Sequence, residues 1–172
     1  QASSYERIRV SVALGIAADG QKHALGLWDG STENARVCQD LLANLQSRGL
    51  CTDRSLLVIL DGSKALRKAV RATFGEAALV QRCQVHKTRN ILEYLSERDR
   101  PWAQAILRRA YQATDVKKAQ HLLLDLARRL EDEYPSAAES VREGLEETLT
   151  VQGLGLSERL QRSLTTTNAA ES

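Results

Sequence analysis

The sequence predicts an α/β fold in which a mixed sheet with flanking helices is followed by an all-helical part. Two observations carry this expectation. In the first half of the chain, apolar patterns typical of strands alternate with apolar residues spaced every three or four positions, as in helices. After about Asp99, every periodic segment is helical. We therefore expect an α/β core over residues 1–98, a helical subdomain over 99–163, and the start of a C-terminal helix over 164–172.

Four segments have the patterns of strands. Arg7–Ala17 alternates and is rich in Val, Ile and Leu. Asp19-Gly20 is a strong hairpin signal, so Lys22–Leu27 is the expected return strand. Leu56–Leu60 is a continuous apolar run, which suits a strand buried on both faces. Ala78–Cys83 is a short fourth strand that completes the α/β part.

Helices are predicted from apolar spacing together with capping residues. In the α/β part they run from Ser31 or Thr32 to Gly49, from Ser63 to Gly75, and from His86 to Leu95. In the helical part they begin at Pro101, at Thr114 or Asp115, and at Pro135. The helix from Pro135 is expected to carry Ala138, Val141, Leu145 and Leu149 on one side.

The composition is typical of a soluble globular protein and argues against a membrane protein. Apolar residues make up 42% of the chain and charged residues 27%. No apolar run approaches the roughly 20 residues of a membrane-spanning helix, and no signal peptide precedes the first expected strand. The three cysteines form no paired spacing, which is typical of a reducing cytosol. We therefore expect a cytoplasmic protein.

Charge is distributed unevenly along the chain, although the formal net charge is only +2. Residues 62–109 contain eleven Lys and Arg against four Asp and Glu, whereas residues 131–158 contain one Arg against eight acids. One part of the protein is therefore suited to a polyanion and another is not.

A basic cluster lies within the positive part. Its members are Lys64, Arg67, Lys68 and Arg71 on one polar helix face, followed by Arg82, Lys87 and Arg89. Binding to DNA relies largely on the neutralisation of phosphates, and the cluster is compatible with that role. An ordinary solvated face is the alternative. Aromatic residues, at 4%, are too few for a platform that stacks single-stranded bases.

Two acids are candidates for chemistry. Asp61 follows a buried strand and precedes Gly62, which is where open α/β sheets place their ligands. The alternative is that Asp61 caps the following helix. Glu171 lies in the first turn of a helix that Thr167 or Asn168 can cap. From the residues alone, a carboxylate favoured there by the helix dipole is the simpler interpretation of Glu171.

Cys83 and His86 form a Cys-x2-His pair that could supply two zinc ligands. A structural zinc site needs four ligands, and no second pair has suitable spacing. We therefore expect no zinc, and a packed or hydrogen-bonding role for the pair beside the active site.

Together these pieces resemble the mutator-type transposases of bacterial insertion sequences. The order, spacing and residue identities of four stretches carry the resemblance, which covers nearly the whole chain. They are Val12–Gly26 with Asp29–Asn34, Leu60-Asp61-Gly62 with its amphipathic helix, Gln81–His86 with Lys87–Asn90, and Thr166–Glu171.

The resemblance implies an RNase H-like fold with a helical insertion before the last acid of an Asp/Asp/Glu triad. It implies that Asp61 is the second acid and Glu171 the third, and that Cys83 and His86 match the family's Cys/Asp-x2-His signature. The first Asp of the family lies on a strand that would precede Gln1. The chain contains no Met and starts with Gln, so we expect a fragment that lacks this Asp and is inactive alone.

The activity implied is metal-dependent cleavage and transfer of DNA strands at transposon ends. Two Mg²⁺ ions, or Mn²⁺, would bind clustered carboxylates and stabilise the attacking and leaving oxygens at phosphorus. The partners implied are the double-stranded DNA of transposon ends and target, and further copies of the protein in an active homo-oligomer. The expected location is the bacterial cytoplasm at the nucleoid, with no membrane involved.

Two other classes remain open. A related RNase H-like nuclease or resolvase would share Asp61 and the metals but would not join strands. An inactive DNA-binding relic of a transposase would share the fold without the chemistry. The helical insertion and the Cys-x2-His pair favour the transposase over the nuclease, and an Asp on an upstream apolar strand would favour the enzyme over the relic.

Overall fold

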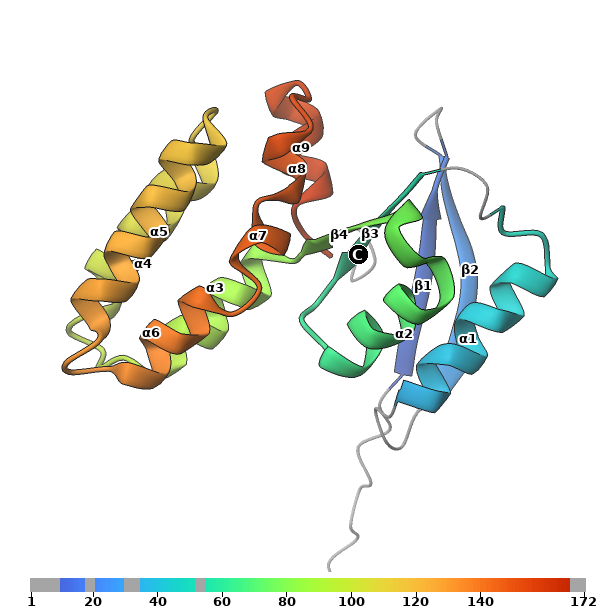
Figure 1. Cartoon of the computed structure of the whole chain (residues 1–172), viewed down its shortest axis with the longest axis horizontal. Helices are drawn as coiled ribbons and strands as arrows, with labels where there is room; N and C mark the ends of the chain where they lie inside the picture. The colour runs from blue at the N-terminus through green and yellow to red at the C-terminus, as the bar shows by residue number, and fades with distance from the viewer. Residues whose placement is uncertain (1–9, 18–20, 30–34, 52–54, 168–172) are drawn as a thin grey trace, which may run out of the picture. The chain divides into compact units, whose positions relative to one another are not determined.

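The computed structural model describes residues 10–17, 21–29, 35–51 and 55–167. These residues form a mixed α/β structure, as expected, in two compact units (Figure 1). The first unit holds β1, β2, α1 and α2; the second holds Leu57–Gly62 of the β3 region and the described chain from Leu79 to Thr167. The expected domain boundaries at residues 98/99 and 163/164 stay predictions.

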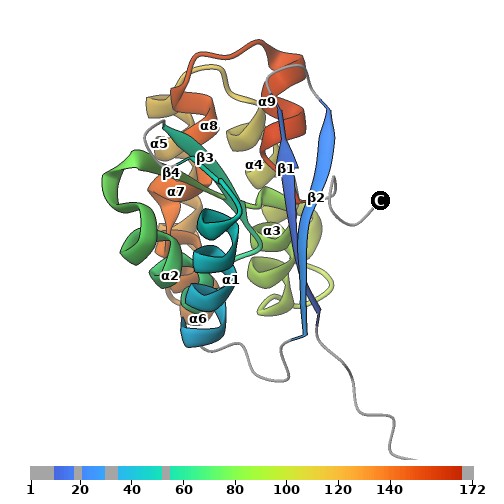
Figure 2. The ribbon, with the colours of Figure 1, turned by 90° about the vertical axis from the view of Figure 1, so that its right-hand side faces the viewer.

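A β-hairpin begins the first unit. β1 (Val10–Ile16) pairs antiparallel with β2 (Lys22–Asp29), so the expected return strand is confirmed (Figure 2). The register runs from Val10 opposite Asp29 to Ile16 opposite Lys22, with an irregularity between Ala13 and Leu14. The turn at Asp19-Gly20 lies outside the described residues.

Two helices complete the first unit. α1 (Ala35–Ser47) buries one stripe, made of Cys38, Leu41, Leu42 and Leu45. The stripe packs over Gly26 of β2, where an added Cβ would lie 3.6 Å from Leu41. α2 (Lys64–Phe74) begins and ends where the sequence predicts: the Ser63 hydroxyl accepts a hydrogen bond from Leu66 N–H at 3.2 Å, and Gly75 follows the last turn. The expected first-helix caps Ser31 and Thr32 lie outside the described residues.

β3 (Leu56–Leu60) and β4 (Ala78–Arg82) form a two-stranded sheet. Their carboxyl ends lie side by side, because Cys83 N–H donates to the Leu60 carbonyl at 2.6 Å. The expectation that β3 is buried on both faces is wrong for the described structure: only Leu60 is buried, and the other four residues are half-buried.

The second unit is mainly helical. α3 starts two residues before the expected His86, with Cys83 at its N-cap. Asp115 caps α5 by accepting a hydrogen bond from Lys117 N–H at 2.9 Å, and a proline opens α4 and α6 as predicted. The bounds are α3 (Gln84–Glu93), α4 (Arg100–Gln112), α5 (Val116–Leu130), α6 (Pro135–Arg142), α7 (Leu145–Thr148), α8 (Thr150–Gly153) and α9 (Glu158–Leu164).

The single helix expected from Pro135 to Leu149 is wrong. The chain breaks at Gly144, which has φ +62°, and this divides α6 from α7. The carbonyls at the end of α6 are bound instead by a side chain from α3: Lys87 Nζ donates to the Ser140 carbonyl and, at 2.6 Å, to the Glu143 carbonyl. A cation is favoured at the carboxyl end of a helix, and here it offsets the missing helical hydrogen bonds.

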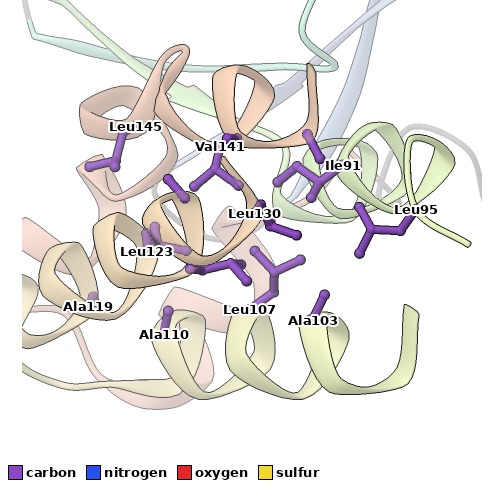
Figure 3. Packing of buried hydrophobic residues seen from close by; sticks show 14 of the residues in the cluster. Ile91, Leu95, Ala103, Leu107, Ala110, Ala119, Leu123, Leu130, Val141 and Leu145 are labelled. Atoms are coloured by element: carbon purple, nitrogen blue, oxygen red, sulfur yellow. The ribbon is translucent and has the colours of Figure 1, made fainter. Parts of the chain in front are cut away.

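One hydrophobic core joins helices α3 to α7 of the second unit (Figure 3). Its fully buried members include Leu107 of α4, Leu126 of α5 and Ala138 of α6. Ile91 and Leu95 extend the same cluster into α3 and the turn after it. The helix that begins at the end of β4 therefore belongs to the helical core, and this links the strand end to the later helices. Among the described residues, no helix combines the length and apolarity needed to span a bilayer.

The core makes a stability prediction. Leu126→Ala should lower the free energy of unfolding by about 2–5 kcal/mol, since it leaves a cavity among residues that cannot fully collapse. Leu124→Ala on the same helix is the matched control, because Leu124 is 38% exposed whereas Leu126 is 0% exposed. Urea unfolding followed by circular dichroism measures both. Equal destabilisation by the two substitutions would contradict the described packing.

Candidate functional site at the carboxyl ends of β3 and β4

Asp61 is the first residue after β3, and its side chain is exposed. The alternative that it caps the next helix is wrong, because Ser63 occupies the N-cap and accepts the hydrogen bond from Leu66 N–H. The intervening Gly62 has φ +118°, a conformation that side-chain-bearing residues rarely adopt. Asp61 therefore stands at a strand end in a tight turn, and the N-cap position of α2 belongs to Ser63.

The guanidinium of Arg82 packs against this turn. A Cβ on Gly62 would lie 3.1 Å from both Arg82 Nε and Arg82 Nη2, and a Cβ on Gly144 would lie 3.1 Å from Nη1. Arg82 Nη1 donates to the Glu143 carbonyl at 3.3 Å and lies 3.5 Å from the Glu143 carboxylate. Nε is buried with no hydrogen-bond partner among the described residues. A cation thus sits against the backbone beside Asp61, held between two glycines.

Cys83 is the first residue after β4, and its fully buried sulfur collects hydrogen bonds. His86 Nδ1 lies 3.2 Å from Sγ. Thr167 donates to the sulfur twice, from its backbone N–H at 3.4 Å and from its hydroxyl at 3.5 Å. The thiol in turn can donate to Thr166 Oγ1 at 3.7 Å. The described contacts of the Cys-x2-His pair are thus hydrogen bonds within the pair and to two threonines.

These contacts change the acidity of the thiol. Burial raises the pKa of Cys83. The hydrogen bonds from the His86 and Thr167 backbone N–H groups, the Thr167 hydroxyl and the His86 ring lower the pKa by more than burial raises it, so the net pKa is about 7. A thiolate accepts hydrogen bonds but cannot donate one, so the donors around the sulfur favour the ionised form.

Glu171 lies outside the described residues, which end at Thr167. Within those residues, no group of three or more His, Cys, Asp and Glu side chains is arranged to hold a metal ion. The described structure places the exposed carboxylate of Asp61 at this end of the sheet, and the Glu143 carboxylate there lies 3.5 Å from Arg82. The metal role of Asp61 and Glu171 stays a prediction.

The basic cluster divides into exposed and internal members. Lys64, Arg67 and Lys68 are exposed on α2, and Arg89 is exposed on α3. Arg71 is half-buried, donates to the Ala78 carbonyl at 3.1 Å and approaches the Glu76 carboxylate at 4.0 Å. Lys87, expected to contact DNA, is 1% exposed and holds the end of α6. Its charge is directed to these carbonyls, and its expected role toward DNA stays a prediction.

A network of buried polar side chains, not anticipated from the sequence, surrounds the end of β4. Gln81 Nε2 donates to the Thr148 carbonyl at 2.8 Å, and its Oε1 accepts from Val151 N–H at 2.8 Å. Gln84 Nε2 donates to the same Thr148 carbonyl at 3.0 Å. The sequence signal for this network is the polar pair Gln81 and Arg82 directly after Val80 in β4. Such polar residues in a strand indicate either an edge strand or buried side chains that have hydrogen-bond partners. Here the burial is paired, and it fixes β4 to α7 and α8.

The acidity of Cys83 makes a prediction about pH. Because the pKa of this thiol is lowered from 9.0 to about 7, its contribution to stability is fully present above about pH 9 and is lost as pH falls through about 7. The difference in unfolding free energy between the unmodified protein and Cys83→Ala should therefore grow as pH rises across this range. Urea unfolding at several pH values measures it. A difference that is constant with pH would contradict the lowered pKa.

Comparison with known proteins places these features in a family. The family described as "Transposase, Mutator family" matches residues 3–172. The chain is 35% identical over 167 residues to the transposase for insertion sequence element ISRM3 of Rhizobium meliloti (strain 1021), covering 94% of this chain and 40% of that protein. It is 34% identical over 141 residues to the transposase for IS6120 of Mycolicibacterium smegmatis, covering 82% of this chain and 43% of that protein.

A third relative is the transposase for IS256 in transposon Tn4001 of Staphylococcus aureus, 30% identical over 146 residues, with 83% of this chain and 37% of that protein covered. The chain thus spans about 40% of the length of such relatives. The match of the family to almost every residue, from the β-hairpin through the strand ends to the helical core, leads to one conclusion: this chain belongs to the Mutator family of transposases.

Proposed function

We propose that this chain is part of the catalytic core of an insertion-sequence transposase, with an RNase H-like arrangement, which cleaves and joins DNA strands with the help of divalent metal ions. The observation that carries the proposal is the position of Asp61 within a chain of this family. Its exposed carboxylate follows β3 directly, and the end of β4 is hydrogen-bonded alongside. Ligands and metals bind at such strand ends in open α/β sheets.

The available donors are compatible with Mg²⁺. This ion prefers oxygen ligands, and Asp61 offers an exposed carboxylate. The softer donors nearby, Cys83 Sγ and His86 Nδ1, are engaged with each other at 3.2 Å. We propose that Asp61 and Glu171 hold the metal, together with groups beyond the described residues. When bound, Mg²⁺ or Mn²⁺ would stabilise negative charge on the attacking and leaving oxygens at phosphorus.

The chain's own residues would shape the surroundings of that metal. The positive φ of Gly62 sets the turn that leaves Asp61 at the strand end. The Arg82 guanidinium packs against Gly62 and places a positive charge at the same turn, where it would lower the cost of bringing a DNA phosphate close. Neither residue needs to form a covalent bond with the DNA.

Double-stranded DNA is the proposed partner, both at transposon ends and at the target. A homo-oligomer of the whole protein would act on it. Lys64, Arg67 and Lys68 are exposed on α2, whose buried residues are Ala69, Val70 and Phe74. Such a row fits the phosphates of a duplex without reading its bases. The names of the relatives support DNA transposition as the process in which this chain takes part.

The metal proposal predicts that Asp61→Asn or Glu171→Gln, placed in the full-length transposase, lowers Mg²⁺-dependent cleavage of transposon ends by at least about 10³-fold, equivalent to about 4 kcal/mol of activation free energy. The melting temperature should change little, because Asp61 is exposed. Asp132→Asn, an exposed acid between α5 and α6, is the matched control. Near-normal cleavage by either test variant would remove that residue from the site.

The DNA proposal predicts a change in salt dependence. Replacing Lys64, Arg67 or Lys68 by Gln should weaken binding to all duplex sequences alike and reduce the slope of log affinity against log salt by about 0.9 for each phosphate that is no longer neutralised. Lys118→Gln, an exposed lysine of α5, should leave the slope unchanged. Fluorescence anisotropy over a salt series measures both. Altered base preference with an unchanged slope would contradict phosphate binding.

A further inference from the structure

The last described segment of the chain, Thr165–Thr167, returns to the end of β4 after the whole helical part has intervened. Gln84 N–H donates to the Thr165 carbonyl at 2.9 Å. The next two residues both contact the sulfur of Cys83, through Thr166 Oγ1 at 3.7 Å and through the N–H and hydroxyl of Thr167 at 3.4 and 3.5 Å. Three successive residues are thus held by two residues at one strand end.

His86 closes this arrangement. Its Nδ1 lies 3.2 Å from the Cys83 sulfur and 3.3 Å from Thr167 Oγ1. The two side chains lie one helical turn apart at the start of α3, so the helix fixes their spacing. Cys83 has 0% exposure, and a buried acceptor gains more from its donors than an exposed one. The lowered pKa of the thiol, about 7, agrees with an acceptor surrounded by donors.

Cys83 also connects to the other candidate acid. Its backbone N–H donates at 2.6 Å to the carbonyl of Leu60, the residue directly before Asp61. One residue therefore joins the strand that presents Asp61 to the segment that leads to Glu171. Glu171 follows Thr167 by four residues, so the chain allows it to lie at most roughly 14 Å from that anchor. Without the Cys83 contacts, the last residue of this segment held at the end of β4 would be Thr165, through its hydrogen bond from Gln84 N–H.

We propose that Cys83 and His86 form a positioning clamp, which holds Thr166 and Thr167 at the end of β4 and thereby fixes where the chain segment carrying Glu171 starts. The functional part of this inference rests on the proposed metal site. Cys83 and His86 are positioning residues in this role and contact neither DNA nor metal. The chemistry required of position 83 is a buried acceptor for two donors of Thr167, which a carboxylate can also provide.

The clamp itself is tested by hydrogen exchange in the full-length protein. Cys83→Ala removes the acceptor, and exchange of the Thr166 and Thr167 amides should become about tenfold faster. Cys83→Asp should restore slow exchange, because the carboxylate accepts the same hydrogen bonds. Cys51→Ala, an exposed cysteine, is the control. Unchanged exchange in α5 shows that the fold is intact.

A second variant keeps the test decisive if Cys83→Ala does not fold. Thr167→Val removes the hydroxyl donor but retains the backbone N–H, so exchange of that amide should rise by a smaller factor than in Cys83→Ala. Exchange equal to that of the unmodified protein in both Cys83→Ala and Thr167→Val would overturn the clamp, whatever the metal site proves to be. If Thr167→Val folds and Cys83→Ala does not, the exchange rate of the Thr167 amide in Thr167→Val alone tests the clamp.

The role in catalysis is tested by Mn²⁺ binding and end cleavage in the same variants. Cys83→Ala should weaken Mn²⁺ binding and lower kcat by roughly 10- to 100-fold with an unchanged Kd for DNA, and Cys83→Asp should restore both. If Asp61→Asn abolishes cleavage while Cys83→Ala cuts and binds Mn²⁺ normally, the positioning role is wrong and the metal proposal stands. If Asp61→Asn itself cuts normally, the metal proposal fails, and the exchange result still decides the clamp.

Discussion

The requirement that buried polar groups find partners governs the part of this chain between Gln81 and Lys87. Within that stretch, Gln81, Arg82, Gln84 and Lys87 are all buried or nearly so, and each carries donors that cannot be left in an apolar interior without cost. Their acceptors come from far along the chain: the carbonyls of Ser140, Glu143 and Thr148. Because these partners lie on α7 and at the end of α6, the hydrogen bonds tie the strand end to those helices.

This coupling explains two local departures from regular structure. Gly144 interrupts what would have been one helix, and the Glu143 carbonyl before it accepts from Lys87 and Arg82 in place of a helical N–H. Gly62 makes a second interruption, and the same Arg82 guanidinium fills the space where a side chain would stand. One cation thus depends on two glycines, and an alanine at either position would have to displace it as well as adopt an unfavourable φ.

Local signals in the sequence were enough for most element boundaries. Ser63 and Asp115 cap α2 and α5 where hydroxyl and carboxylate caps are expected, and Gly75 ends α2 in a positive-φ conformation. These features depend on residues within one turn of each other, so composition and spacing reveal them. The strand pairing of β1 with β2 follows for the same reason, since the partners are joined by a short connection.

Long-range contacts set the limit of such reasoning. The break after α6 depends on Lys87, 53 residues before Ser140, and the sulfur of Cys83 meets Thr167 84 residues later. No local pattern carries these pairings. For the candidate site, the sequence predicted Asp61 at a strand end, and the structure adds the packing of Arg82 against Gly62 and the contacts of Cys83 with Thr167. The roles of Asp61 and Glu171 in holding metal still rest on the family resemblance, because Glu171 lies outside the described residues.

Burial also changes what the charge of the chain means for DNA. Residues 62–109 carry eleven basic residues, but Arg82 and Lys87 among them bind interior carbonyls and Glu143. The exposed charge is therefore smaller than the sequence count. It is carried by Lys64, Arg67, Lys68, Arg89, Arg98, Arg100, Arg108 and Arg109. The two internal cations act differently: they hold the end of α6 and the turn beside Asp61 in place. Buried charge of this kind is screened little by salt, whereas the DNA contacts proposed for α2 should be sensitive to it.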